Sequence, residues 1–308
     1  MASKTPQETA AAAVEAGTTK AKLSWDKALV GGFLAGAYIA FGGLVAIAVS
    51  SGLKPETWGT LPTLFAGSVF ALGLVLVVLA GSELLTGNMA LVPIAMMKNR
   101  VGLRALGENF TIVLIGNLIG SLFVAYFLAV KTGVIGTAGV DPSEPAGMTF
   151  ERLSQIAVLK GDTEGADQIF LRALGCNWLV CLAVWVAMSA KDTAGKILGI
   201  FFPIMAFVAM GFDHVVANMF FLPAAIFTGA GNITWGDALH NWLFAGLGNL
   251  VGAAIFVAGA YWYLYARPEE ESGAGAGGVR EEVDAAREGG NGAREESGAV
   301  GASSQPTG

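Results

Sequence analysis

The chain has 308 residues, of which 54% are hydrophobic and 14% are charged, whereas soluble domains carry about 25% charged residues. The net charge of −6 comes largely from acidic residues after Pro268, so it says nothing about a substrate, and no basic stripe for nucleic acid is present. The two cysteines, Cys176 and Cys181, are spaced neither as a zinc motif nor as a CxxC redox pair. The composition excludes a soluble domain and predicts an all-α membrane protein, for which we expect no metal and no cofactor.

Six apolar stretches are long enough to cross ~30 Å of hydrocarbon, which takes about 20 residues. Residues 1–22 precede them and are expected to be a disordered tail. Residues 267–308 form a low-complexity acidic tail that is also predicted to be disordered, which leaves residues 23–266 as the six-span membrane domain. The six stretches lie near residues 28–50, 63–97, 110–131, 168–190, 196–228 and 239–265.

Lysine and arginine residues gather on one side of these spans. They precede the first stretch and fill the links between the second and third and between the fourth and fifth: Lys20, Lys22, Lys27, Lys98, Arg100, Arg104, Lys191 and Lys196. Because cytoplasmic loops carry an excess of these residues, we expect both termini in the cytoplasm, with the chain crossing the inner (plasma) membrane several times.

The second and fifth stretches are too long and too polar to be simple spans. The second places Glu83 and Asn88 among apolar neighbours, and the fifth places Asp213, His214 and Asn218 likewise. Non-helical backbone at membrane depth survives only where protein or a water-filled cavity covers it. Each stretch is therefore predicted to be a helix broken around a central cavity.

The two broken stretches match each other residue by residue at an offset of 130 positions. Similar matches at an offset of 132 occur in the third and sixth spans. Three spans in each half force the second half to insert upside down, which predicts an inverted 3+3 repeat with halves at about 23–135 and 165–266. The matching pairs are Glu83/Asp213, Asn88/Asn218, Met89/Met219, Pro93/Pro223, Asn109/Asn241, Gly116/Gly248, Asn117/Asn249 and Gly120/Gly252.

The acidic pair is expected to have a structural role at the helix breaks, together with Asn88. Glu83 and Asp213 occupy equivalent places, and a carboxylate stabilises the start of a helix by accepting from its free N–H groups. Both acids are therefore predicted to cap the second half of a broken helix.

His214 is the residue that breaks the symmetry between the halves, since the equivalent position in the first half is Leu84. Intramembrane ionisable groups are functional candidates, and histidine gains and loses a proton near neutral pH. Burial disfavours its charged form and an arriving anion favours it. His214 is therefore predicted to hand a proton to a weak-acid anion, with the hydroxyl of Thr86 facing it from the other break.

At these residues the sequence resembles the formate/nitrite transporter family. The matching strings are AGSELLTGN (80–88), ALGCNWLVCLAVW (173–185) and FDHVVANMFFLP (212–223), and with the span pattern the resemblance covers about residues 25–265. It implies an aquaporin-like protomer in a homopentamer with one pore per protomer. It also implies a central histidine at His214, a threonine at Thr86 and pathway asparagines at Asn177 and Asn218.

The resemblance further implies two apolar constrictions and a lysine that attracts anions. The lysine maps to Lys160. The constrictions map to Phe70, Leu74 and Phe207 on one side of the centre, and to Leu84, Leu85 and Val180 on the other.

The predicted function is a channel or proton-coupled transporter for small monovalent anions, formate first, that moves protons with the anion. Nitrite, acetate-like acids and hydrosulfide are alternatives within the same class. An aquaporin-like channel for neutral solutes is an alternative from another class, and it would be expected to show NPA repeats and a filter arginine. A membrane-embedded enzyme would need a metal cluster or a nucleophile with its base, and the sequence supplies neither, so no enzyme activity is expected.

Overall fold

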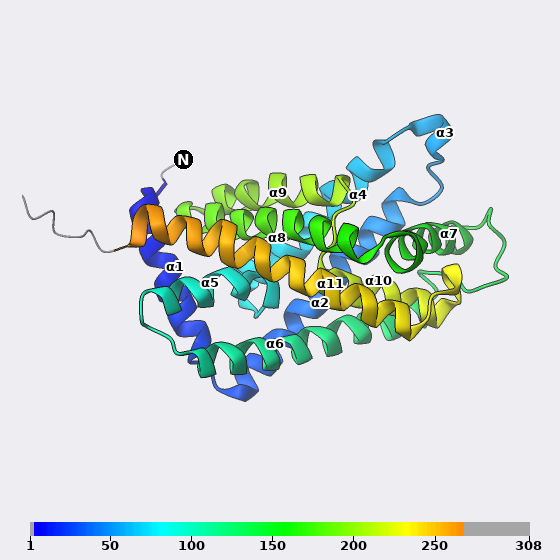
Figure 1. Ribbon diagram of the computed structural model, residues 1–308. Helices are drawn as coiled ribbons and strands as arrows, with labels where there is room; N and C mark the ends of the chain where they lie inside the picture. Colours follow the sequence, from blue (N-terminus) through cyan, green and yellow to red (C-terminus); the bar gives the residue numbers. More distant parts are fainter. Residues whose placement is uncertain (1–2, 268–308) are drawn as a thin grey trace, which may run out of the picture. The chain divides into compact units, whose positions relative to one another are not determined.

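The computed structural model describes residues 3–267, and every element within them is helical (Figure 1). Segments η1, η2, η3, η5 and η6 are π-helical and η4 is a 3₁₀ turn. The elements are α1 (Pro6–Ala21), α2 (Trp25–Ser50), α3 (Pro55–Trp58), α4 (Leu61–Leu76), η1 (Val77–Gly81), α5 (Leu85–Met97), α6 (Leu103–Phe123), η2 (Val124–Val130), α7 (Pro145–Val158), η3 (Leu159–Thr163), α8 (Ala166–Ser189), α9 (Thr193–Ala209), α10 (Val215–Thr228), η4 (Ala230–Asn232), α11 (Trp235–Ala253), η5 (Ala254–Gly259) and η6 (Trp262–Ala266).

Within residues 3–267, five helical stretches are long and apolar enough to cross a membrane, which confirms the predicted all-helical membrane protein with several spans. Three further apolar helices, α5, α9 and α10, have 13, 17 and 14 residues. At 1.5 Å per residue they reach roughly 20–25 Å, less than the ~30 Å of a bilayer core. The five long stretches are Trp25–Ser50, Leu61–Gly81, Leu103–Val130, Ala166–Ser189 and Trp235–Ala266.

The expected disorder of residues 1–22 is wrong for Pro6–Ala21, which form α1 across one end of the helix bundle (Figure 1). Thr5 and Glu8 form a capping box, in which each side chain accepts a hydrogen bond from the other residue's N–H. Ala10 and Ala13 are fully buried. The alanine-rich segment is therefore an amphipathic helix that covers the bundle. The predicted disorder of 267–308 lies outside the described residues, apart from Arg267.

Two long helix pairs, α2 with α6 and α8 with α11, approach each other through glycine. A Cβ on Gly120 of α6 would lie 2.0 Å from the Phe33 carbonyl oxygen of α2, and a Cβ on Gly252 of α11 would lie 2.2 Å from the Leu174 carbonyl oxygen of α8. Backbone contact of this kind holds membrane helices together, because lipid gives no hydrophobic drive for their association. Gly120 and Gly252 are equivalent positions in the sequence repeat, so both pairs use the same device.

Candidate functional site

The two breaks have the same backbone course. The helix before each break ends near a glycine with positive φ, Gly81 at 80° and Gly211 at 71°, a conformation that costs glycine nothing. The chain then runs extended to Leu84 and His214, after which α5 and α10 begin. Both pairs, Gly81/Gly211 and Leu84/His214, are separated by the 130 residues of the sequence repeat.

Two asparagines fix the breaks from neighbouring helices. Asn117 of α6 accepts a hydrogen bond from the Leu85 N–H at 2.9 Å, and its amide donates to the Glu83 carbonyl oxygen at 2.8 Å. Asn249 of α11 accepts from the Val215 N–H at 2.9 Å. Each amide thus satisfies the free N–H at the start of a half-helix, which would otherwise be a buried, unpaired donor.

The prediction that the acidic side chains cap the half-helices is therefore wrong. The N–H groups of Leu85, Val215 and Ala217 at the helix starts donate instead to the side chains of Asn117, Asn249 and His214. Glu83 instead pairs with Lys20 of α1 at 2.8 Å and accepts from the Asn88 amide at 3.0 Å. Asn88 also donates to Asn109 at 3.0 Å.

The second acid has the same set of partners at the opposite end of the bundle. Asp213 pairs with Lys160 at 2.9 Å and accepts from the Asn218 amide at 2.7 Å. Asn218 also donates to Asn241 at 2.8 Å, and the amide of Asn241 donates to the Lys160 carbonyl oxygen. We call these two sets the α1-side cluster (Lys20, Glu83, Asn88, Asn109) and the α7-side cluster (Lys160, Asp213, Asn218, Asn241). Lys20 is a member that sequence reasoning missed, because it lies 63 residues from Glu83.

The central pair is formed where the two breaks meet. The Nε2 atom of His214 lies 2.8 Å from the Thr86 hydroxyl, and its Nδ1 accepts from the Ala217 N–H at 3.1 Å. Since Nδ1 is an acceptor, the proton of the neutral ring is on Nε2, which donates to Thr86. Both side chains are buried. The predicted pairing of His214 with Thr86 is thus present, with a defined tautomer.

Asn177 hydrogen-bonds to the backbone of this pair and not to its side chains. Its amide donates to the Thr86 carbonyl oxygen at 3.1 Å and to the Asn249 carbonyl oxygen at 2.8 Å. The structure therefore places Asn177 in the scaffold that positions Thr86.

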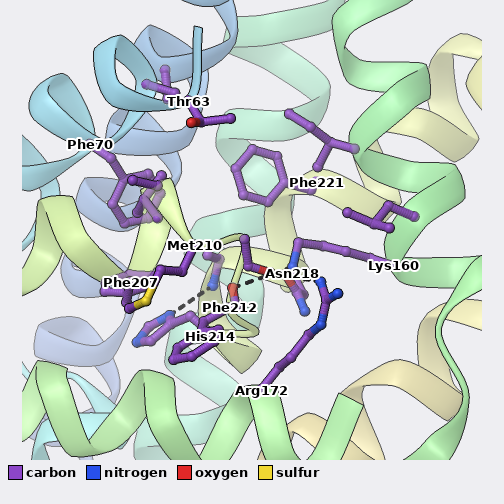
Figure 2. Close-up of a pocket in the computed structure, with 18 of the residues that line it drawn as sticks. Thr63, Phe70, Lys160, Arg172, Phe207, Met210, Phe212, His214, Asn218 and Phe221 are labelled. Carbon is purple, nitrogen blue, oxygen red and sulfur yellow. Dashed lines mark hydrogen bonds between the residues drawn. The ribbon is translucent and has the colours of Figure 1, made fainter. Parts of the chain in front are cut away.

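A cavity of about 440 Å³ reaches His214 from the end of the bundle that carries α7 (Figure 2). Lys160, Arg172 and Asn218 lie on one side of it, and Phe70 and Phe207 lie on the other. We call it the α7-side cavity. Asn218 lines it with both amide hydrogens already donated, while its Oδ1 is buried with no partner among residues 3–267. The cavity thus has two cations and a free hydrogen-bond acceptor on the same side of its lining.

Beyond His214 the space shrinks to a void of about 10 Å³, roughly the room that one water molecule needs. His214, Phe70 and Phe207 line both the cavity and the void, so they form the partition between them. Of the six predicted constriction residues, the void is lined by five, and Leu85 is absent from its lining. The others that line it are Ile39, Leu74, Leu84, Val180 and Ile204.

Ile39 and Ile204 were not predicted, because an apolar residue in an apolar helix carries no sequence signal for a pore. Arg172 and Glu164 were also missed as a pair. Arg172 donates to Glu164 and to the Gly211 carbonyl oxygen, and it lines the α7-side cavity. The sequence signal that could have identified this pair is Arg172 itself, a basic residue near the end of an apolar span.

Together these features describe a polar entry, a central proton-bearing pair and a dry constriction. An ionised solute in an apolar constriction loses its hydration without compensation, which costs many kcal/mol, whereas a neutral one of the same size does not. The site is therefore suited to a small solute that enters as an anion and crosses the narrowest part without charge.

Known proteins are similar to this chain in sequence and in fold. A sequence profile described as Formate/nitrite transporter matches residues 7–263. The uncharacterized transporter YrhG of Bacillus subtilis is 49% identical over 86% of this chain and 95% of its own. A probable formate transporter of Methanothermobacter thermautotrophicus is 45% identical over 85% of this chain and 97% of its own. A solved structure titled "Pentameric formate channel with formate bound" matches with a TM-score of 0.67 and 26% identity over 79% of this chain and 98% of that one. The chain therefore belongs to the formate/nitrite transporter family, whose members are channels and transporters and not enzymes.

Proposed function

We propose that this protein carries a small monovalent anion, formate first, across the membrane, and that it protonates the anion at His214. The observation that carries this proposal is the Thr86–His214 hydrogen bond of 2.8 Å, which lies between a cavity lined by cations and an apolar void. Formate is preferred over nitrite, acetate and hydrosulfide because relatives include a probable formate transporter and a formate channel of Bacillus thuringiensis.

The proposed route begins in the α7-side cavity. Lys160 and Arg172 line it and attract the anion, which then reaches Thr86 and His214. The unpartnered Oδ1 of Asn218 accepts a hydrogen bond from a protonated acid and repels an anion, so it favours the neutral form near the histidine. The neutral acid then passes Leu74, Leu84 and Val180.

Proton transfer at His214 requires a change in its hydrogen bonds. The ring holds its single proton on Nε2 while Nδ1 accepts from Ala217. For Nε2 to give its proton to formate, Nδ1 must release the Ala217 N–H and take up a proton that arrives from the aqueous side of the α7-side cavity. Without that second proton, the transfer would leave an imidazolate. The N-terminus of α10 disfavours a positive ring, so the charged state is short-lived and returns its proton readily.

The proposed topology follows from the repeat. Each half contributes three spans, with α4–α5 and α9–α10 as the broken ones, and the halves insert in opposite directions. The positive-inside rule places both termini in the cytoplasm and the α7-side cavity outside the plasma membrane. The homopentamer is proposed from the pentameric formate channel that this chain resembles.

Purified protein in proteoliposomes tests the substrate directly. We expect formate to cross faster than acetate, nitrite or hydrosulfide when each is offered at the same concentration and the same inward pH gradient. His214→Phe, which removes both the ring nitrogens and the Thr86 bond, is expected to abolish pH-dependent formate flux. Equal flux of all four anions would overturn formate as the preferred substrate, and unchanged pH-dependent flux in His214→Phe would overturn the protonation step.

A further inference from the structure

The two acidic clusters differ in one respect. In the α1-side cluster both oxygens of Glu83 have donors, Lys20 on Oε1 and Asn88 on Oε2. In the α7-side cluster, Lys160 and two asparagines all donate to Oδ1 of Asp213, and its Oδ2 is buried with no partner in the described part of the chain. The repeated cluster is thus saturated in one half and has a vacant acceptor in the other.

A second carboxyl group stands beside the vacant oxygen. Glu164 lies between η3 and α8, its side chain has no exposed surface, and Arg172 donates to its Oε1. Its Oε2 is also buried without a partner among residues 3–267, and the Glu164 and Asp213 carboxyl groups lie within hydrogen-bonding reach of each other. Two buried carboxylates this close repel each other, whereas one proton between them converts the repulsion into a hydrogen bond.

We propose that Glu164 and Asp213 share one bound proton, and that this proton sets the positive charge with which the α7-side cavity receives its anion. This inference rests on the proposed function. The α1-side cluster has one cation and one acid, whereas the α7-side site has two cations, Lys160 and Arg172, facing two acids. With both acids ionised the site is neutral, and with the shared proton bound it carries one positive charge.

The other charged groups around the pair do not alter this balance. His214, adjoining Asp213, is neutral in the arrangement described above, and Asp237 of α11 is engaged by the N–H and hydroxyl of Thr234. Arg152 of α7 lines the same cavity and donates to Ser50, and its guanidinium group is charged in both states of the pair. Protonation of the pair is therefore the change that adds positive charge at the base of the cavity.

The proton binds in the range in which a transporter of weak acids works. Burial, with the nearby charge of Asp213, raises the pKa of Glu164 to about 7. Below this pH the site is positive and favours the anion, and above it the site is neutral. At an effective dielectric of ~20, a unit charge within ~12 Å of an anion changes its affinity by about tenfold or more. The half-saturating formate concentration is therefore expected to rise about tenfold as the external pH passes from about 6 to about 8.

Infrared difference spectroscopy of the wild-type protein in lipid tests the shared proton without any need for transport. We expect a carbonyl band of a protonated carboxyl group at about pH 6 that is lost by about pH 8, one unit on either side of the raised pKa. Glu164→Gln should lack the band, and Glu144→Gln, which removes an exposed glutamate, should keep it. If Glu164→Gln does not assemble, labelling wild-type protein with ¹³C-glutamate must shift the band.

Flux measurements then test the link to anion binding. In Glu164→Gln the site keeps one positive charge at every pH, so the half-saturating formate concentration should stay near its acidic value. A wild-type protein without the titrating band, or a band unmoved by both the variant and the label, overturns the shared proton. A Glu164→Gln variant with the wild-type pH profile overturns its effect on anion entry. Absence of formate transport in the wild type overturns the proposed function instead. The infrared band then still tests the shared proton, because its measurement does not depend on transport.

Discussion

Removal of the Asn249 side chain should destabilise the protein more than removal of a side chain that makes contacts only at the surface. Its Oδ1 accepts from the Val215 N–H, and its amide donates to the carbonyl oxygens of Ala173 and Asp213 at 2.7 and 2.9 Å. In Asn249→Ala all three bonds are lost at a fully buried position. The start of α10, with His214 just before it, is then left unsupported.

The size of the effect follows from those three bonds. Interhelical hydrogen bonds in membrane proteins contribute about 0.6 kcal/mol each, and a buried donor left unpaired, here the Val215 N–H, costs about 1–3 kcal/mol. Loss of the two bonds to carbonyl oxygens together with the unpaired donor should therefore lower the free energy of unfolding by about 2–4 kcal/mol. For a chain of this size that corresponds to a melting temperature roughly 10 °C lower.

The protein's own cysteines provide the assay. Cys176 and Cys181 are both buried and free, so a thiol-reactive fluorophore labels them only when the helices around them open. Thermal scans in detergent should show the drop for Asn249→Ala, and a similar drop for Asn117→Ala at the equivalent position. Thr132→Ala, which removes an exposed hydroxyl that donates to the Leu128 carbonyl oxygen of the preceding segment η2, should stay within about 0.5 kcal/mol of the wild type.

A melting temperature for Asn249→Ala equal to that of Thr132→Ala would refute the idea that the asparagine amide holds the break. A drop for Asn249→Ala without one for Asn117→Ala would refute the equivalence of the two halves.

Three further changes test other parts of the structure. Gly120→Val places a side chain against the Phe33 carbonyl oxygen, so we expect loss of the assembled protein on size-exclusion chromatography. Gly107→Ala, with open space around it, should elute unchanged, and normal assembly of Gly120→Val would contradict the close contact. Leu84→Ala enlarges the void of about 10 Å³, so acetate flux should rise more than formate flux, and a constant ratio would show that Leu84 does not limit passage. Because the folded-state pKa of Glu164 is raised from 4.5 to about 7, its contribution to stability is complete below pH 4.5 and is lost as the pH rises through about 7. The melting temperature of Glu164→Gln should not show this decline with pH, and an identical decline in the variant would contradict the raised pKa of Glu164.

The breaks, and Asn117 and Asn249 as a matched pair, could be predicted from the sequence because each has a partner at a fixed offset. Their role in holding the starts of α5 and α10 could not, since the sequence pointed to Glu83 and Asp213 instead. Polar residues in an apolar stretch are costly in lipid, so Asn117 and Asn249 stand out even before their bonds to Leu85 and Val215 are known. The position of His214 within a break is visible in the same way.

The contacts between distant segments could not be predicted from the pattern. Lys20 is one of several basic residues near the N-terminus, and only the packing of α1 brings it to Glu83. Asn177 lies in a string that resembles the family, but its amide is used by carbonyl groups of the scaffold. Glu164 lies in a polar link, where nothing distinguishes a buried acid from a solvated one.

Proton movement with formate in His214→Asn tests the central claim most directly. Asparagine at this position retains an oxygen that caps α10 at the Ala217 N–H, so the break stays supported, but it does not titrate. In proteoliposomes with a trapped pH dye, we expect wild-type protein to acidify the interior as formate enters, and His214→Asn to fold normally and lose this coupled acidification. Equal acidification per formate in both proteins would contradict a proton transfer at His214.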